Sequence, residues 1–144
     1  MKDYKGYLLG SKNKILLGLI TNYMFHHIRN IFSAKKLYIT KRKLELIKTK
    51  HSLEYEYIKS DSFQTILDNC VAKCEYSKDE KVLNFISFID GKYILYGISN
   101  NSYYTHLTTI FYPSKKQLIN CKVTMKFFSE KLKQDFEEFL NKKN

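Results

Sequence analysis

Apolar and polar positions along the chain follow two different periods, and the change falls after Asn69. Before Asn69 the apolar residues recur every three or four positions, which is the period of a helix with one buried face. After it they alternate with polar residues, which is the period of a half-buried strand. Helices followed by an antiparallel meander are typical of an α+β domain, and we predict that fold class.

The first predicted helix begins at Ser11, a favourable N-cap residue, and ends near Ser33. The apolar stretch from Ile15 to Phe25 is interrupted by polar residues and is shorter than the roughly 18 residues that a membrane span requires. No small-residue cleavage site follows it, so the pattern does not indicate a signal peptide. We therefore expect a soluble, cytoplasmic protein with no membrane partner.

Two shorter helices should follow. Thr40 comes after a short apolar run at residues 37–39 and is the predicted cap of a helix from Lys41 to Lys50. Asp61 and Gln64 have the spacing of a capping box and predict a third helix. The apolar face of the second helix carries Leu44, Ile47 and His51, and that of the third carries Phe63, Ile66 and Leu67.

β-Branched and aromatic residues predict four strands between residues 71 and 112. These are Val71–Tyr76, Val82–Ile89, Lys92–Ser99 and Tyr103–Tyr112. Asp90-Gly91 is the strongest hairpin turn, because both central positions of a type I′ turn need a positive φ. Alternation of apolar and polar residues from Ile119 to Phe127 predicts a fifth strand after Pro113.

Ser129 is the predicted cap of a C-terminal helix whose apolar side carries Leu132, Phe136, Phe139 and Leu140. The expected architecture is therefore N-terminal helices packed on a four- to five-stranded antiparallel sheet, followed by a C-terminal helix. We expect a single domain over residues 1–144. It divides into a helical extension at 1–36, an α+β core at 37–128 and the last helix at 129–144.

The distribution of charge along the chain is more informative about function than the net charge. The chain has 25 Lys and Arg against 14 Asp and Glu, a formal net charge of +11. The abundance of Lys, Ile, Asn and Tyr is also what an AT-rich genome produces, so part of the excess can be codon bias. However, residues 1–51 carry 12 basic and 2 acidic residues, whereas residues 52–112 carry 5 and 8. A basic face of this kind favours a polyanionic partner.

Motifs with strict spacing are absent from the sequence. There is no Gly-rich phosphate loop, HExxH, calcium loop or GxSxG, and the carboxylates are spread over predicted turns and helix starts. Cys70, Cys74 and Cys121 have no nearby histidine to complete a zinc set, so we expect reduced structural thiols. We predict neither a metal nor another cofactor.

The remaining His, Lys, Thr, Ser and Tyr residues suit cleavage of RNA without a metal. RNA carries its own nucleophile, the 2′-hydroxyl group. An enzyme therefore needs a base for that proton, an acid for the departing 5′-oxygen, and cations or hydroxyl donors around the phosphate. Histidine titrates near neutral pH and is the usual acid or base.

The four histidines differ in their surroundings. His26 and His27 lie among apolar residues of the first predicted helix, where a packed or surface role is the usual one. His51 ends the basic helix, a position that also suits an ordinary helix-end cap. His106 and Thr108 would point to the same side of a strand and so share a cleft, although threonines there also fit simple β-propensity.

Several segments together resemble the phage- and toxin-borne branch of the barnase/EndoU/colicin/RelE ribonuclease superfamily. In that branch a Lys-His pair at the end of an N-terminal helix precedes a four-stranded antiparallel sheet, and a Phe-Tyr-Pro-Ser segment follows. The corresponding segments here are residues 39–44, Lys50-His51, 83–85, 93–95 and 104–116, the last of which contains Phe111-Tyr112-Pro113-Ser114. The resemblance covers roughly residues 38–118.

This resemblance implies a role for particular residues. His51 would be an acid or base, with Lys48 and Lys50 binding phosphate beside it. Thr108 or Thr109 and Ser114 would donate hydrogen bonds to the scissile phosphate, supported by Lys115 or Lys116. We add His106 as a further catalytic candidate, and Lys41, Arg42 and Tyr112 as RNA-binding candidates, although such tyrosines are more often half-buried sheet residues.

Three functions follow as hypotheses. The first is a metal-independent endoribonuclease toxin of a phage or mobile element, acting on tRNA or other structured RNA in the bacterial cytoplasm and neutralised by an acidic antitoxin or immunity protein. The second is a non-enzymatic basic phage or mobile-element protein that binds nucleic acid or a host protein. The third is an interaction module that keeps the nuclease fold without its chemistry. Catalysis predicts that His51, His106, Thr108 and Ser114 converge.

Overall fold

The computed structural model describes residues 14–28, 35–59, 63–75, 82–100 and 105–142. Its strands are β1 (Lys14–Leu19), β2 (Lys36–Thr40), β3 (Cys70–Cys74), β4 (Val82–Ile89), β5 (Lys92–Asn100), β6 (Thr105–Phe111) and β7 (Lys126–Phe127). Its helices are α2 (Asn22–Ile28), α3 (Lys41–Lys50), α4 (Ser52–Lys59), α5 (Phe63–Asp68), α6 (Lys115–Lys122) and α7 (Glu130–Asn141).

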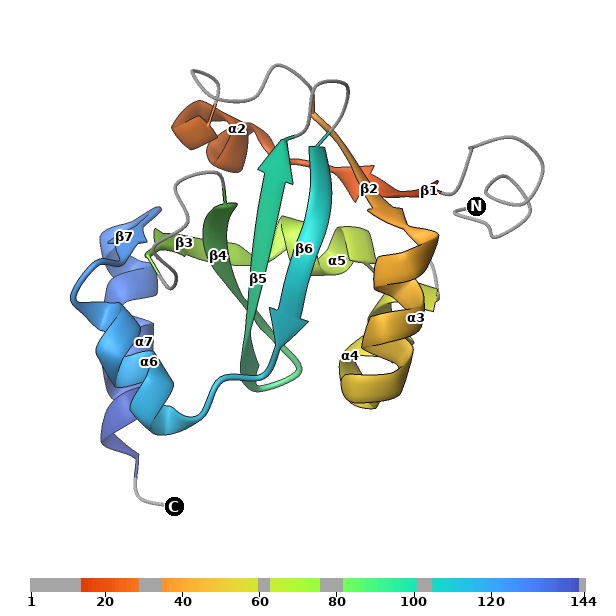
Figure 1. Ribbon diagram of the computed structural model, residues 1–144. Coiled ribbons are helices and arrows are strands. Elements are labelled where there is room, and N and C mark those ends of the chain that lie inside the picture. The colour runs from red at the N-terminus through yellow and green to blue at the C-terminus, as the bar shows by residue number, and fades with distance from the viewer. Residues whose placement is uncertain (1–13, 29–34, 60–62, 76–81, 101–104, 143–144) are drawn as a thin grey trace.

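The strands form one seven-stranded sheet in the order β1-β2-β6-β5-β4-β3-β7 (Figure 1). Strands β2 and β6 are parallel, and every other neighbouring pair is antiparallel. The α+β class and the C-terminal helix are therefore confirmed. The four- to five-stranded, purely antiparallel sheet is wrong, because strands from both ends of the chain extend the central meander.

The central hairpin forms where local signals are strongest. Strand β4 has the bounds predicted from the sequence, and β5 pairs with it along its whole length. Asp90 and Gly91 have φ angles of 53° and 77° at the turn between them. These positive values confirm the predicted two-residue hairpin.

The sheet buries both of its faces, and alternation along β5 separates them. Ile94, Tyr96 and Ile98 belong to a core shared with α2, α3 and α5. Tyr93 and Leu95 belong to a second core shared with α6 and α7. In Figure 1, α3 and α4 lie on one side of the central strands β5 and β6, and α6 and α7 lie on the other.

The predicted first helix is wrong over its first part. Residues Lys14–Leu19 form β1, in which Ile15 and Leu17 are buried while Leu16 is exposed. Almost every position here is apolar, so the sequence fits both periods. Helix α2 begins only after Thr21, whose hydroxyl accepts a hydrogen bond from the Met24 amide at 3.3 Å. Ser11, Ile31 and Ser33 lie outside the described residues, and among the described helices none is long and apolar enough to cross a membrane.

Gln64 joins β1 to α5. Its side-chain oxygen accepts a hydrogen bond from the Leu19 amide at 2.7 Å, and its side-chain nitrogen donates one to the Leu19 carbonyl at 2.9 Å. A Cβ atom at Gly18 would lie 2.5 Å from the same Gln64 oxygen, so glycine permits this approach. Gln64 was expected to close a capping box with Asp61, which lies outside the described residues.

The predicted fifth strand is also largely wrong. Residues Lys115–Lys122 form helix α6, and only Lys126–Phe127 pair with the sheet, as β7 beside β3. Helix α6 places Leu118 and Cys121 in the core at helical spacing, while Ile119 is exposed. The alternation of apolar and polar residues in this segment is therefore a coincidence, because its buried residues follow the period of a helix.

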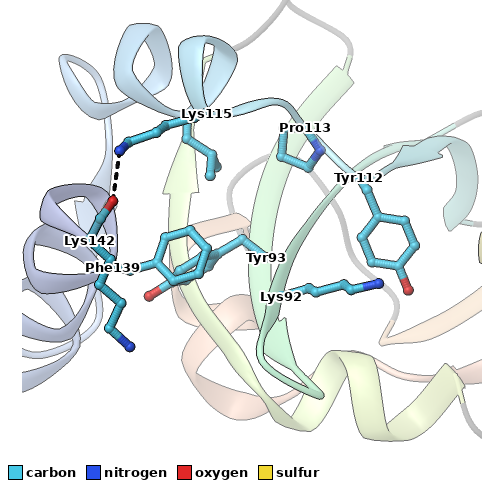
Figure 2. A pocket seen from close by; sticks show the side chains of 8 residues that line it. Lys92, Tyr93, Tyr112, Pro113, Lys115, Phe139 and Lys142 are labelled. Atoms are coloured by element: carbon cyan, nitrogen blue, oxygen red, sulfur yellow. Dashed lines mark hydrogen bonds between the residues drawn. The ribbon is translucent and has the colours of Figure 1, made fainter. Parts of the chain in front are cut away.

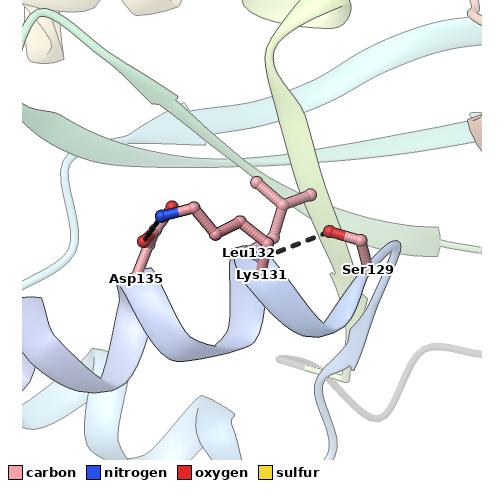
Figure 3. Close-up of polar contacts among 4 residues, drawn as sticks. All are labelled: Ser129, Lys131, Leu132 and Asp135. Atoms are coloured by element: carbon pink, nitrogen blue, oxygen red, sulfur yellow. Dashed lines mark hydrogen bonds and ion pairs between the residues drawn. The ribbon is translucent and has the colours of Figure 1, made fainter.

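Helix α7 confirms the prediction for the C-terminus. The Ser129 hydroxyl accepts a hydrogen bond from the Leu132 amide at 3.2 Å, and Lys131 forms an ion pair of 2.9 Å with Asp135 one turn later (Figure 3). Phe136 is fully buried against the second core. The helix is thus fixed at its start and along its inner face.

Candidate active site around His51

His51 connects two helices. Thr40 caps α3 as predicted, accepting a hydrogen bond from the Lys43 amide, and the His51 amide donates to the Ile47 carbonyl at 2.7 Å to end the helix. The His51 carbonyl then accepts from the Tyr55 amide at 2.9 Å as α4 begins. The imidazole is 38% exposed, so it is accessible to a ligand while its backbone is held on both sides.

Glu54 lies beside this imidazole. Its Oε2 atom is 3.6 Å from His51 Nδ1, within range of an ion pair but longer than a hydrogen bond. The Glu54 side chain is only 7% exposed. Burying a carboxylate is costly unless it has partners, so its position next to His51 needs a second contact to hold it.

That second contact comes from the end of β6. The Tyr112 amide donates a hydrogen bond to Glu54 Oε2 at 3.0 Å, linking α4 to a residue 58 positions further along the chain. The same carboxylate oxygen therefore faces both a histidine and a backbone donor. We call His51 and Glu54 the His51–Glu54 pair.

Two lysines stand over aromatic rings around this pair. Lys48 Nζ lies 5.9 Å from the centre of the Tyr55 ring, and Lys92 Nζ lies 5.4 Å from that of Tyr112. Both distances are in the range of cation–π attraction. One lysine thus lies on the helix that ends at His51, and the other lies over the ring of the residue whose amide contacts Glu54.

Tyr112 also lines a pocket of about 260 Å³ on the side of α6 and α7 (Figure 2). We call it the α7 pocket. Its walls are Lys92, Tyr93, Tyr112, Pro113, Lys115, Leu118, Phe139 and Lys142. Lys115 Nζ donates a hydrogen bond of 3.1 Å to the Lys142 carbonyl across one end. Three lysines and three aromatic rings therefore surround one cavity.

His106 does not join His51. It lies near the start of β6, whereas Tyr112 follows the end of that strand, six residues and roughly 20 Å away. The His106 ring contacts the Ser99 hydroxyl at 3.1 Å, on the neighbouring strand. The expected convergence of the two histidines is therefore not found.

Thr108 and Thr109 lie in a strand irregularity. Gly97 pairs with Thr109 and Ile98 pairs with Leu107, which leaves Thr108 as the extra residue of a bulge. The Thr108 hydroxyl donates to the Gly97 carbonyl at 3.0 Å, and Thr109 is half-buried. His106 and Thr108 share a side of β6 as predicted, and the bulge shifts the alternation only after Thr108, so that Ile110 joins Leu107 in the core. The hydrogen bond that the structure gives the Thr108 hydroxyl goes to Gly97 and not to the His51–Glu54 pair.

Ser114 caps helix α6. Its hydroxyl accepts a hydrogen bond from the Gln117 amide at 3.2 Å, and the Gln117 side-chain oxygen accepts one from the Ser114 amide at 2.8 Å. This reciprocal pair is a capping box. A helix cap accounts for Ser114 without a role in catalysis.

The predicted RNA-binding residues lie on different parts of the molecule. Lys48 and Lys50 lie in the last turn of α3 before His51, whereas Tyr112 and Lys115 line the α7 pocket. Lys41 and Arg42 are exposed at the start of α3, roughly 15 Å from His51 along the helix. Lys116 is exposed on α6 and does not line the pocket.

The cysteines carry no disulfide and are held as thiols. Burial raises the pKa of Cys70 to about 12. A hydrogen bond with Cys121, together with burial, raises the pKa of Cys74 well above its usual value. Within the described ranges, no three His, Cys, Asp or Glu side chains gather as metal ligands.

Sequence reasoning missed Glu54, Lys92 and Lys142. Glu54 follows His51 by three residues, a spacing that brings two side chains together at a helix start, but helix α4 was not predicted. Lys92 and Lys142 come together only through the packing of β5 against α7. No local signal identifies them.

Comparison of the whole chain with models of protein families, with curated proteins and with solved structures finds no match in any of the three.

Proposed function

We propose that the chain is an endoribonuclease that cleaves RNA by attack of the 2′-hydroxyl group, without a metal. The observation that carries the proposal is the His51–Glu54 pair: an exposed imidazole faces a buried carboxylate that is itself fixed by the Tyr112 amide. A histidine oriented by a carboxylate is the usual arrangement of a general base. The resemblance described above supports the same residue from the sequence side.

In this reaction His51 takes the proton from the 2′-hydroxyl through Nε2, because Nδ1 faces Glu54. The 2′-oxygen forms a bond to phosphorus, and the bond to the 5′-oxygen breaks. The departing oxygen takes a proton from the Tyr112 phenol, which lies beside Lys92. The products are a 2′,3′-cyclic phosphate and a 5′-hydroxyl end.

The surrounding cations would support the charged phosphate. Lys48 and Lys50 occupy the last turn of α3, and Lys92 stands over Tyr112. Fixed positive charge placed where negative charge develops is an effective form of catalysis. The basic face would also attract RNA from solution.

The first experiment incubates the purified protein with total RNA in EDTA, after removal of any bound inhibitor. We expect new fragments that end in 2′,3′-cyclic phosphate. His51→Ala should lower the rate at least about 10²-fold, as for loss of a general base. His26→Ala, at an exposed histidine of α2, is the matched control and should retain the rate. Absence of cleavage by the wild-type protein would contradict the proposal.

A second experiment tests the role of Tyr112. Tyr112→Phe keeps the ring and the backbone donor to Glu54, so the site should stay assembled. Loss of the phenol proton should lower kcat by about 10²-fold with little change in KM. An unchanged kcat would remove Tyr112 as the acid while leaving His51 in place.

The exposed cations of α3 favour a second candidate, a non-enzymatic nucleic-acid-binding protein. Lys41, Arg42, Lys48 and Lys50 are all exposed along this helix. Such a protein would bind RNA with an affinity that falls steeply with salt and depends on these four residues but not on His51. Binding without cleavage, unchanged by His51→Ala, would favour this candidate over the enzyme.

The biological setting that fits the enzyme best is a toxin of a phage or mobile element that acts on tRNA or other structured RNA in the bacterial cytoplasm. Its inhibitor would be an acidic antitoxin or immunity protein that covers the basic face. The test is expression in bacteria: wild type should stop growth and His51→Ala should not. Equal growth with both proteins would contradict a toxin.

A further inference from the structure

Most residues of the α7 pocket have no part in the proposed cleavage reaction, which uses only Tyr112 and Lys92 of its lining. Among the described residues that line it are two tyrosines, a phenylalanine, a proline and a leucine, with three lysines and no acidic residue. Flat apolar walls suit an aromatic ring, and the lysines suit an anion. A nucleotide combines the two, because its aromatic base is linked to an anionic phosphate.

The size of the pocket limits the ligand. Its volume of about 260 Å³ lies just below the range of pockets that hold drug-sized molecules. One nucleobase fits this scale, whereas a stack of bases or a duplex does not. The ligand is therefore a base that is already unpaired or has been turned out of a helix.

The aromatic wall is rigid. The Tyr93 ring meets Phe136 and Phe139 edge to face, with ring centres 5.0 and 4.9 Å apart, and Phe88 lies 4.6 Å away on the other strand. These contacts fix Tyr93 between β5 and α7. Tyr93 is only 5% exposed, so the accessible surface is the half-buried Phe139 ring that packs on it. A base that stacks on a ring already held in place loses little conformational entropy.

The lysines are placed around the two ends of the pocket. Figure 2 shows Lys92 directed toward Tyr112 on one side, and Lys115 with Lys142 on the other. The Lys92 ammonium is held near the Tyr112 ring at 5.4 Å, next to the residue that contacts Glu54. A phosphate at this end would lie beside Tyr112, which lines the pocket and whose amide contacts Glu54.

From these observations we propose that the α7 pocket binds one unpaired nucleobase of a single-stranded RNA, adjacent to the phosphate that is cleaved at His51. The proposal rests on the proposed ribonuclease function for the identity of the chain that carries the base. It adds a position of substrate selection: RNA is cleaved next to a nucleotide that can leave its helix.

The first experiment titrates the ¹⁵N-labelled full-length protein with 5′-AMP, 5′-GMP, 5′-CMP and 5′-UMP, and separately with ribose 5-phosphate and inorganic phosphate. At least one nucleotide should shift the amide signals of Tyr93, Tyr112 and Phe139, and should bind roughly tenfold more tightly than ribose 5-phosphate because the base stacks. Equal binding of ribose 5-phosphate, or no shift with any nucleotide, would overturn the proposal.

Variants locate the site. Lys142→Gln changes an exposed residue whose backbone contact to Lys115 does not need its side chain, so folding should be unaffected. It should weaken nucleotide binding several-fold, and Phe139→Leu should weaken it roughly tenfold. Lys126→Ala removes the same charge from an exposed position on β7 outside the pocket and should leave the affinity unchanged. Equal losses in Lys142→Gln and Lys126→Ala would overturn a specific pocket.

A third experiment distinguishes binding of single-stranded RNA from binding of a free nucleotide. A 2′-O-methyl oligonucleotide cannot be cleaved by the proposed reaction, and its single strand should bind more tightly than the same sequence in a duplex. Phe139→Leu should reduce that preference. Cleavage of RNA without nucleotide binding would refute the pocket and leave the ribonuclease standing. Nucleotide binding without cleavage would refute the ribonuclease and leave the pocket as a nucleotide-binding site. Tighter binding of the mononucleotide than of the single strand would overturn the assignment of RNA as the ligand.

Discussion

Glu54 performs two tasks with one oxygen atom. It faces His51 Nδ1 at 3.6 Å and accepts the Tyr112 amide at 3.0 Å. The first contact concerns the orientation of the imidazole, and the second concerns the attachment of α4 to the end of β6. Substitutions can separate these two contributions.

Glu54→Gln keeps an oxygen that can accept from Tyr112 but removes the negative charge. We expect cleavage to slow by about tenfold to a hundredfold, with a small effect on the free energy of unfolding. Glu54→Ala leaves the Tyr112 amide without its acceptor and should also cost about 1–3 kcal/mol of stability. Urea denaturation and initial cleavage rates on both variants check this. Equal stability losses in the two variants would contradict the separation.

At the scale of elements, β1 and α5 depend on each other through Gly18 and Gln64. Gly18→Ala would force Gln64 away from Leu19, because the new Cβ lies 2.5 Å from its side-chain oxygen. We expect a loss of about 1–3 kcal/mol in the free energy of unfolding. Gln64→Ala should cost a similar amount, and the double variant should cost less than the two losses together. Additive losses would show that the two residues act independently.

Helix α6 allows the cap and the chemistry of Ser114 to be distinguished. Ser114→Ala should lower stability by about 1 kcal/mol, and Ser114→Asn should restore most of it, because asparagine also caps helices. If Ser114 acts only as a cap, both variants cleave RNA at the wild-type rate under conditions where they are folded. A loss of kcat in the stable Asn variant would reinstate the hydroxyl as a donor to the phosphate.

Local signals account for the elements that the sequence predicts well. Thr40, the helix that follows it and the Asp90-Gly91 turn depend on residues within a few positions of each other. Strand β1 was not predicted because nearly all of its residues are apolar, so its sequence fits the period of a helix as well as that of a strand. Helix α6 was missed because its exposed Ile119 and Val123 imitate an alternating strand.

The candidate site could be predicted only in part for the same reason. His51 was found because it ends a recognisable helix. Tyr112, whose amide holds Glu54, follows a strand far along the chain, and the α7 pocket requires α7 to pack on β5. The bulge at Thr108 was not predicted because nothing in the alternation of residues indicates it, and it moves Ile110 away from the side of His106 and Thr108.

At the scale of the whole molecule, buried cysteine and tyrosine side chains lower the stability of the fold at alkaline pH. Burial raises the pKa of Cys70 to about 12. Burial, together with the nearby Asp135, also raises the pKa of Tyr93 to about 12. The pKa of Tyr96 is raised by burial as well. In the unfolded chain a cysteine ionises near pH 8.5 and a tyrosine near pH 10. The unfolded state therefore releases protons first as the pH rises, and stability is lost.

We expect the free energy of unfolding to fall between pH 8.5 and pH 10, by up to about 1.4 kcal/mol per pH unit for Cys70. This window lies below the titration of most lysines, whose loss of charge would relieve repulsion and act in the opposite direction. Chemical denaturation at four pH values measures the slope. Cys70→Ala should make the slope shallower, and an unchanged slope would contradict the assignment.

The parallel pairing of β2 with β6 affects how the protein is made. Leu37 pairs with Thr105, and Glu54 meets Tyr112, so both contacts join the first half of the chain to residues synthesised much later. Closing such long loops is entropically costly and slow. A growing chain on the ribosome therefore carries His51 long before it carries the strand that fixes Glu54. Under the proposed ribonuclease function, an unfinished chain would lack the fixed Glu54 and would therefore be inactive toward the message that encodes it.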